Sequence, residues 1–255
     1  MDKREIEDKR LSCVVKSNEL ITNSRFNLST QQQKIILYLI SQINYSDKEF
    51  KLYEFDIKDF CEICSIDICG RTYNELKEQI KALRDKSIWI ELENGKETLI
   101  SWIEKPYIDK KNGKIQIRLD EDMKPYLLEL KSNFTKYELV YTLNFKSKYA
   151  IRLYEFIKSK HYKELYRYDF TIDVEELKKR MGAENYTRFT NFHDRALKPA
   201  IAEINAYSDK HIEYDFIYKG RKIIEIDFSI TTQDILSRTK NSILLDEKDA
   251  LRNGE

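Results

Sequence analysis

The sequence predicts an α+β chain built from two tandem winged helix-turn-helix domains related by internal duplication. Three observations predict this fold. The two halves repeat the same short motifs at an offset of about 115 to 125 residues, which is the size of a domain. Each half shows the periodicities of a helix, a strand, two helices and a hairpin, in that order. Only 6 glycines and 3 prolines occur in 255 residues, which favours regular elements over loops.

The duplicated motifs keep the same order in both halves. The matched pairs are Leu37-Tyr38 with Leu153-Tyr154, Phe55-Asp56-Ile57 with Phe170-Thr171-Ile172, residues 76–80 with 197–201, and Asn94-Gly95-Lys96 with Lys219-Gly220-Arg221. We therefore expect four segments: a polar tail over 1–12, a first winged-helix domain over 13–131, a second over 132–231, and a polar tail over 232–255. Both tails are expected to be poorly ordered, with 243–245 apolar enough to dock.

In the first half, Ser29 and Gln32 form a capping-box pattern, and apolar residues then recur at helical spacing up to Ile43. A strand over 52–55, a helix over 57–64 and a turn over 66–70 follow. Thr72 and Glu75 form a second capping-box pattern, which opens a longer helix. Residues 88–92 and 98–103 flank Asn94-Gly95, a strong hairpin signal. A strand over 114–119 and a linking helix over 123–130 complete this half.

The second half repeats the series, with a helix over 146–161, a strand over 168–172 and a helix over 174–181. Gly182 follows that helix, where a glycine commonly ends a helix in the left-handed conformation. A longer helix over 191–207, capped by Thr190, precedes a hairpin of strands 212–218 and 222–230. Pro199 lies inside the long helix and removes one of its hydrogen bonds, so the helix either kinks there or begins elsewhere.

The long helix of the second half is the strongest candidate for reading DNA, because the second helix of such a pair enters the major groove. Its start carries polar residues at spacings of 3, 4 and 3, which place them on one stripe. They are Arg188, Asn191, Arg195 and Lys198. Arginine can bind guanine and asparagine can bind adenine, each through two hydrogen bonds. An ordinary solvated face is the alternative, which the position between a helix and a hairpin disfavours.

The first half offers a weaker counterpart, because acidic residues lie among its cations. Its candidates are Arg71, Asn74, Lys77 and Lys81 on the helix and Lys96 on the hairpin. A solvated or protein-facing surface remains an equal alternative there. The second hairpin carries Lys219, Arg221 and Lys222, which we expect to contact phosphate and so to position the protein without reading sequence. Basic runs over 105–118 and 146–167 are further candidates for positive surface, although such runs are usually solvated.

Composition and motifs exclude several classes. The net charge of +1 creates no global field for nucleic acid, so DNA binding must rest on local charge. No apolar run reaches the ~18 residues of a membrane span, and no secretory signal begins the chain, so we expect a cytoplasmic protein. No P-loop, G-x-S-x-G or H-E-x-x-H motif occurs, so we expect no enzyme, catalytic site or cofactor. Cys61-x-x-Cys64 lacks a second pair and is interpreted as core, so we expect no metal.

Several stretches resemble the initiator replication (Rep) proteins of iteron-containing plasmids. They are Val14-Val15-Lys16-Ser17-Asn18-Glu19-Leu20-Ile21, Phe26-Asn27-Leu28, Gln33-Lys34-Ile35-Ile36-Leu37, Ser147-Lys148-Tyr149-Ala150-Ile151-Arg152-Leu153-Tyr154-Glu155, Tyr186-Thr187-Arg188-Phe189, and Leu197-Lys198-Pro199-Ala200-Ile201-Ala202-Glu203-Ile204-Asn205. The resemblance covers about residues 13–230, and the family keeps the proline of the last stretch. Relatives are more basic where this chain has His193-Asp194, so specific contacts at those two positions are in doubt.

The resemblance implies a sequence-specific DNA-binding protein with two winged-helix domains, which starts plasmid replication in the bacterial cytoplasm. The second domain would read direct repeats (iterons) at the origin, with Arg188, Asn191, Arg195 and Lys198 in the major groove. The first domain would add DNA contacts and the surface for a homodimer that represses its own gene at an operator. The host replication initiator and helicase would be further partners. A transcription regulator without a replication role, and a protein-interaction module that binds no DNA, remain alternatives.

Overall fold

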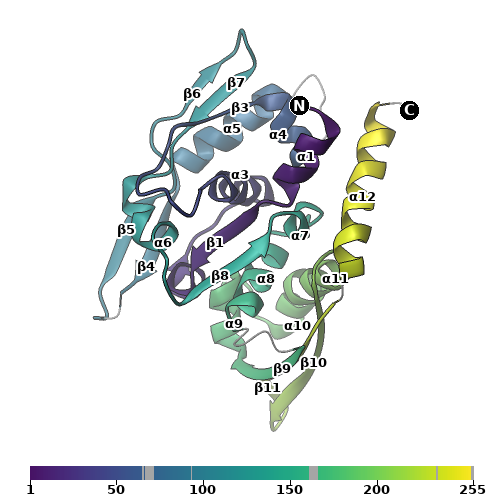
Figure 1. Cartoon of the computed structure of the whole chain (residues 1–255). Coiled ribbons are helices and arrows are strands. Elements are labelled where there is room, and N and C mark those ends of the chain that lie inside the picture. Colours follow the sequence, from purple (N-terminus) through teal and green to yellow (C-terminus); the bar gives the residue numbers. More distant parts are fainter. Residues whose placement is uncertain (65, 67–71, 93, 161–165, 234, 254–255) are drawn as a thin grey trace.

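The computed structural model describes residues 1–64, 66, 72–92, 94–160, 166–233 and 235–253, and confirms two winged-helix domains (Figure 1). Arg71 and residues 67–70 of the expected turn lie outside this part. The first domain contains α3 (Thr30–Ser41), β3 (Tyr53–Asp56), α4 (Ile57–Ile63), α5 (Thr72–Arg84) and the hairpin β4 (Ser87–Glu91) and β5 (Glu97–Ser101). The second contains α8 (Lys148–Lys160), β9 (Arg167–Asp173), α9 (Val174–Met181), a long helix described below, and the hairpin β10 (Lys210–Lys219) and β11 (Lys222–Thr232).

Local signals placed most of these boundaries correctly. The Ser29 hydroxyl accepts the Gln32 amide at 3.2 Å, and the Gln32 side chain accepts the Ser29 amide at 3.0 Å, so this capping box is formed. Thr72 is already helical, and it therefore lies inside α5 rather than before it. Gly182 ends α9 with φ of 66°, the left-handed value that favours glycine. Its amide and that of Ala183 then satisfy carbonyls of the last turn.

The two domains share the element order but differ in strand pairing. In the second domain β9 joins the wing, giving the sheet order β10-β11-β9. In the first domain the wing pairs instead with β2 (Ser24–Arg25), in the order β2-β4-β5. There β3 pairs with β7 (Lys114–Ile117), which forms a hairpin with β6 (Tyr107–Asp109). Residues 107–117 thus supply a second hairpin, which occupies the edge of β3 that the wing occupies in the other domain.

A two-stranded ladder that we did not expect joins the start of the chain to its middle. β1 (Cys13–Ser17) pairs antiparallel with β8 (Phe134–Glu138) and lies between the domains in Figure 1. Lys16 of β1 forms an ion pair with Glu155 of α8 at 2.7 Å. The proposed division between residues 131 and 132 is therefore crossed by backbone hydrogen bonds and a buried charge pair. It remains a proposal about how the chain is organised.

Short elements connect these parts. α2 (Asn18–Thr22) follows β1, and α7 (Val140–Leu143) precedes α8. The expected linking helix over 123–130 is shorter: a 3-10 turn (Glu121–Met123) leads into α6 (Lys124–Leu127). Leu128 is already extended, with φ of −113° and ψ of 153°, and is buried together with Leu127.

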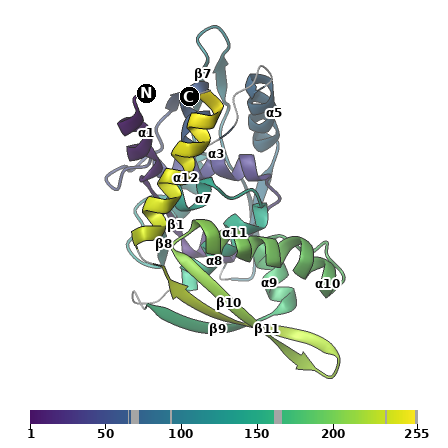
Figure 2. The same cartoon turned by 90° about the vertical axis from the view of Figure 1, so that its right-hand side faces the viewer.

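The expectation of poorly ordered tails is wrong. Residues Lys3–Arg10 form α1 and Ile235–Asn253 form α12, which runs along the molecule in Figure 2. Arg10 is 2% exposed and donates to the carbonyls of Glu62 and Ile63 and, at 3.1 Å, to Asp246 of α12. Leu245 is fully buried in the core. A few inward residues thus fix each end, although the average composition of the ends is polar.

Leu245→Ala tests how firmly α12 is held. Because the side chain is fully buried, we expect the free energy of unfolding to fall by about 2 kcal/mol. Ile243 lies two residues earlier on the same helix and is 52% exposed. Ile243→Ala is therefore the matched control, with an expected change of at most about 0.5 kcal/mol in a denaturant titration. Equal losses for the two variants would contradict the docking of α12.

Candidate nucleic-acid interface

One continuous helix with a widened turn occupies the recognition position. It comprises α10 (Phe189–Phe192), the π-helical turn η2 (His193–Leu197) and α11 (Lys198–Tyr207), packed across the domain in Figure 2. The helix begins at Phe189, so Arg188 is the capping residue and Thr190, the expected cap, lies inside. Phe189 is half-buried, and the other side chains of the apolar face are buried, namely Phe192, Ala196, Ala200, Ile201 and Ile204.

The π turn accounts for Pro199. The amide of Lys198 donates to the carbonyl of His193, five residues earlier, instead of four. Proline has no amide hydrogen, so position 199 makes no backbone hydrogen bond to an earlier carbonyl in any helix. The change from four-residue to five-residue spacing just before it therefore sacrifices no hydrogen bond at this position. The irregularity expected around Pro199 thus takes the form of a π turn just before it.

The predicted reading stripe is exposed. Arg188, Asn191, Arg195 and Lys198 all lie on the surface, and none of them forms an ion pair with any residue that the structure describes. Positively charged side chains without an internal partner are available for phosphate or base edges. Asp194 is also exposed, and its carboxylate lies 2.7 Å from Nδ1 of His193.

The wing brings its cations to the start of this helix. Lys219, Arg221 and Lys222 are exposed around a turn in which Gly220 has φ of +63°. A groove of about 500 Å³ lies where the wing, the start of the helix and α9 meet. Arg221 and Lys222 of the wing, Thr187 and Thr190 near the start of the helix, and Glu175 and Lys178 of α9 line it. The two threonines were not singled out in the sequence, where nothing distinguishes them from other surface hydroxyls.

Aromatic side chains of β10 hold the wing against the helix. Phe216 packs edge-on against Phe189 with ring centroids 5.2 Å apart, and it contacts His193 at 5.5 Å. Tyr214 lies next to Phe216 on the same face of the strand, and its hydroxyl is 2.9 Å from Nε2 of His193. We did not expect Tyr214 and Phe216 to contact the helix, although aromatic residues at alternate positions of a strand indicate a shared face.

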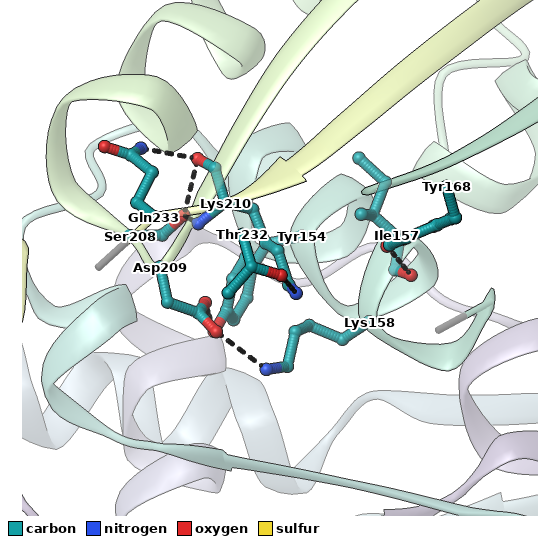
Figure 3. Close-up of polar contacts among 9 residues, drawn as sticks. All are labelled: Tyr154, Ile157, Lys158, Tyr168, Ser208, Asp209, Lys210, Thr232 and Gln233. Carbon is teal, nitrogen blue, oxygen red and sulfur yellow. Dashed lines mark hydrogen bonds and ion pairs between the residues drawn. The ribbon is translucent and has the colours of Figure 1, made fainter. Parts of the chain in front are cut away.

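A polar cluster fixes the other end of the helix to α8 (Figure 3). Asp209 accepts hydrogen bonds from Tyr154 at 2.7 Å and from Lys158 at 2.9 Å. Lys210 donates to Thr232 across the base of the wing at 2.7 Å, and burial lowers the pKa of Lys210 to about 8. Lys158 is thus held internally by Asp209, and Arg152 is buried, so this part of the basic run 146–167 does not present its charges to DNA.

The candidates of the first domain lie on a less basic surface. Asn74, Lys77 and Lys81 are exposed on α5, and Lys96 is exposed beside the β4–β5 turn. On this wing Glu91 and Glu97 lie directly opposite each other, and Arg25 pairs with Glu97. Adjacent carboxylates repel phosphate, so this wing is less suited to contacting DNA than the second. Arg71 lies outside the described residues.

We searched the described part of the chain for metal sites and membrane-spanning helices. There, no group of three or more His, Cys, Asp or Glu side chains is arranged to hold a metal ion, and no helix has the length and apolarity to cross a membrane. Cys61 and Cys64 are fully buried, as interpreted from the sequence. Burial raises the pKa of Cys64 to about 12, which keeps this thiol protonated.

Two winged-helix domains, the second with an unpaired cationic helix and wing, define a DNA-binding protein of the tandem winged-helix class. Residues 13–158 match the family described as "Initiator Replication protein, WH1", and residues 173–230 match "Initiator Rep protein, WH2". The chain belongs to this family of replication initiators, as the resemblance indicated. The family is one of DNA-binding proteins and is not known for enzymatic activity.

Individual relatives agree with this assignment. A "Replication initiation protein" from Escherichia coli is 25% identical over 240 residues, which cover 90% of this chain and 73% of the relative. The crystal structure of the Pi initiator protein in complex with iteron DNA has a TM-score of 0.74 at 21% identity, over 88% of this chain and 99% of that one. Domains 2 and 3 of RctB give a TM-score of 0.51 at 10% identity, over 83% and 86%. At these identities, the two solved structures show a shared fold.

Proposed function

We propose that this protein starts replication of a plasmid by binding direct repeats at its origin. The observation that carries the proposal is the exposure of Arg188, Asn191, Arg195 and Lys198 on the recognition helix, against which the cationic wing packs. Membership of the initiator family supports it, and so does the similarity to an initiator whose structure contains iteron DNA.

The proposed mechanism is binding without bond breaking. The recognition helix of the second domain enters the major groove, where Asn191 and Arg195 read base edges. Lys219, Arg221 and Lys222 contact phosphate and fix the register. In the first domain Asn74, Lys77, Lys81 and Lys96, with Arg71, add contacts that lengthen the site. Opening of the duplex follows from binding to an array of repeats and from partners.

Further assignments belong to the same proposal. The protein acts in the bacterial cytoplasm, as a monomer at the repeats and as a homodimer that represses its own gene at an operator. The first domain supplies the dimer surface, and the host replication initiator and helicase are the partners recruited. Analytical ultracentrifugation with and without repeat DNA tests the change from dimer to monomer.

A replication assay separates an initiator from a transcription regulator with the same fold. The gene and its neighbouring DNA are cloned on a vector that lacks an origin, and transformants are counted. An initiator sustains the vector, and a regulator does not. A variant with Arg188, Arg195 and Lys198 all replaced by Ala is the control, because it should fold normally and lose maintenance of the vector.

Lys222→Ala should weaken binding to cognate and scrambled DNA alike. If Lys222 contacts one phosphate, the slope of log affinity against log salt falls by about 0.9. Lys240→Ala, which removes an exposed lysine of α12, should leave the slope unchanged. Titrations by fluorescence anisotropy at several salt concentrations measure both. A selective loss on cognate DNA would show that Lys222 reads sequence instead.

A further inference from the structure

We infer that His193 is a positioning residue, which holds the wing at a fixed distance from the recognition helix through its hydrogen bond to Tyr214. This inference rests on the proposed DNA binding and extends it to residues that do not themselves face the DNA. His193 is the first residue of the π turn, and its side chain is 19% exposed. The side chain is directed at the wing, in contrast to Arg195 and Lys198.

The hydrogen-bond pattern is determined by Asp194. Its carboxylate lies 2.7 Å from Nδ1 of His193, and a carboxylate can only accept, so Nδ1 carries a proton. In a neutral ring Nε2 then has a free lone pair, which accepts the hydroxyl proton of Tyr214 over 2.9 Å. Asp194 thus orients the ring that binds the wing. This gives a role to the two positions at which direct DNA contacts were in doubt.

The wing pairs with β9 along β11 only, so its β10 side depends on side-chain contacts with the helix. β10 is an edge strand of the sheet β10-β11-β9, so its outer edge has no neighbouring strand. The amide of Ile212 and the side chain of Asn205 fix its base. Beyond that point, Tyr214 and Phe216 contact His193 and Phe189, and Lys219 at the tip lies past the last of these contacts.

Fixing the wing matters for binding two features of DNA together. Arg221 and Lys222 can contact phosphate while Arg195 reaches base edges only if the wing keeps a fixed spacing from the helix. A wing that moves freely loses conformational entropy when it binds, and this weakens affinity. The hydrogen bond between His193 and Tyr214 fixes the wing during folding, so this entropy is not lost again when DNA binds.

Tyr214→Phe is the decisive variant, because it removes only the hydroxyl and keeps the ring contact with Phe216. We expect affinity for the cognate repeat to fall about fivefold, the value of one hydrogen bond. In a Lys222→Ala background the same substitution should cost less than about threefold, because a wing that has lost one of its phosphate contacts gains less from being fixed. Tyr45→Phe, at a side chain 93% exposed in the first domain, is the matched control and should change nothing.

A second variant tests the same bond from the other side. His193→Phe keeps a ring against Phe189 and Phe216 but removes both nitrogens. It should match the loss of Tyr214→Phe, and the double variant should lose no more than either single one. A role in stability alone would lower the melting temperature and reduce affinity equally in both Lys222 backgrounds, which would overturn the inference.

The outcome is separable from that of the proposed function. If the unaltered protein shows no salt-sensitive preference for repeat DNA, the proposed function fails. If it binds the repeat normally and the Tyr214 and Lys222 effects simply add, only the positioning role of His193 fails. Binding titrations of the four proteins in the cycle decide between these results.

Discussion

Arg195→Ala is expected to weaken binding to the cognate repeat by about 1–3 kcal/mol and to relax the choice of sequence. The side chain is exposed on the π turn of the recognition helix and has no ion-pair partner in the described part of the chain. Its removal therefore costs the fold little, and the loss reports contacts with DNA. Arginine that bridges O6 and N7 of guanine discriminates against the other bases, so binding to scrambled DNA should change much less.

Gel-shift titrations on cognate and scrambled repeats measure the two affinities for Arg195→Ala. Arg167→Ala is the matched control, because it removes the same charge from an exposed position of β9, on the sheet rather than the recognition helix. It should leave both affinities within a factor of about two. Equal losses on both DNAs for Arg195→Ala would assign Arg195 to the phosphate backbone instead of the bases.

Glu155→Leu is expected to lower the free energy of unfolding by about 3–5 kcal/mol, because it leaves the buried charge of Lys16 without a partner. The side chains of Lys16 and Glu155 are each 6% exposed and lie 2.7 Å apart. Tyr137 donates to the same carboxylate at 2.5 Å. Burial and the neighbouring Glu155 raise the pKa of Tyr137, so its hydroxyl keeps the proton it donates. For a chain of this size we expect the melting temperature to fall by roughly 6–20 °C.

Thermal and denaturant unfolding measure the effect of Glu155→Leu. The double variant Lys16→Met/Glu155→Leu removes both charges and should recover more than half of the lost stability. Glu54→Leu breaks an exposed pair with Lys114 and should hardly change stability, since both side chains are more than 40% exposed. A double variant as unstable as the single one would attribute the loss to packing around Glu155 rather than to the unpaired lysine.

Much of the second domain could be predicted from local patterns. The boundaries of α9, its left-handed glycine at Gly182, and the two strands flanking Gly220 were all expected within a few residues. The exposed stripe from Arg188 to Lys198 followed from helical spacing, because a continuous helix places residues three and four apart on one face. The π turn preserved this stripe while relieving the conflict at Pro199.

The features that the sequence did not predict depend on contacts between distant residues. β1 and β8 are more than a hundred residues apart in the sequence. Each is too short and too mixed in composition for its pairing partner to be predicted. β3 pairs with β7 instead of the wing, because an extra hairpin competes for its edge. In the sequence Arg10 is indistinguishable from the other cations of a charged segment. In the structure it donates to the carbonyls of Glu62 and Ile63 and to the carboxylate of Asp246.

The sequence by itself determined the duplication, the winged-helix order and the residues that face outward on the recognition helix, because periodicity and capping act within a few residues of the chain. Only the tertiary structure decided which charged side chains face solvent and which bind other groups of the protein. Arg152 and Lys158 belong to the same basic run as exposed lysines, yet they bind Ser24 and Asp209 inside the molecule. Whether a charge serves DNA or the fold depends on which groups lie within hydrogen-bonding distance, and folding brings those groups together from remote positions.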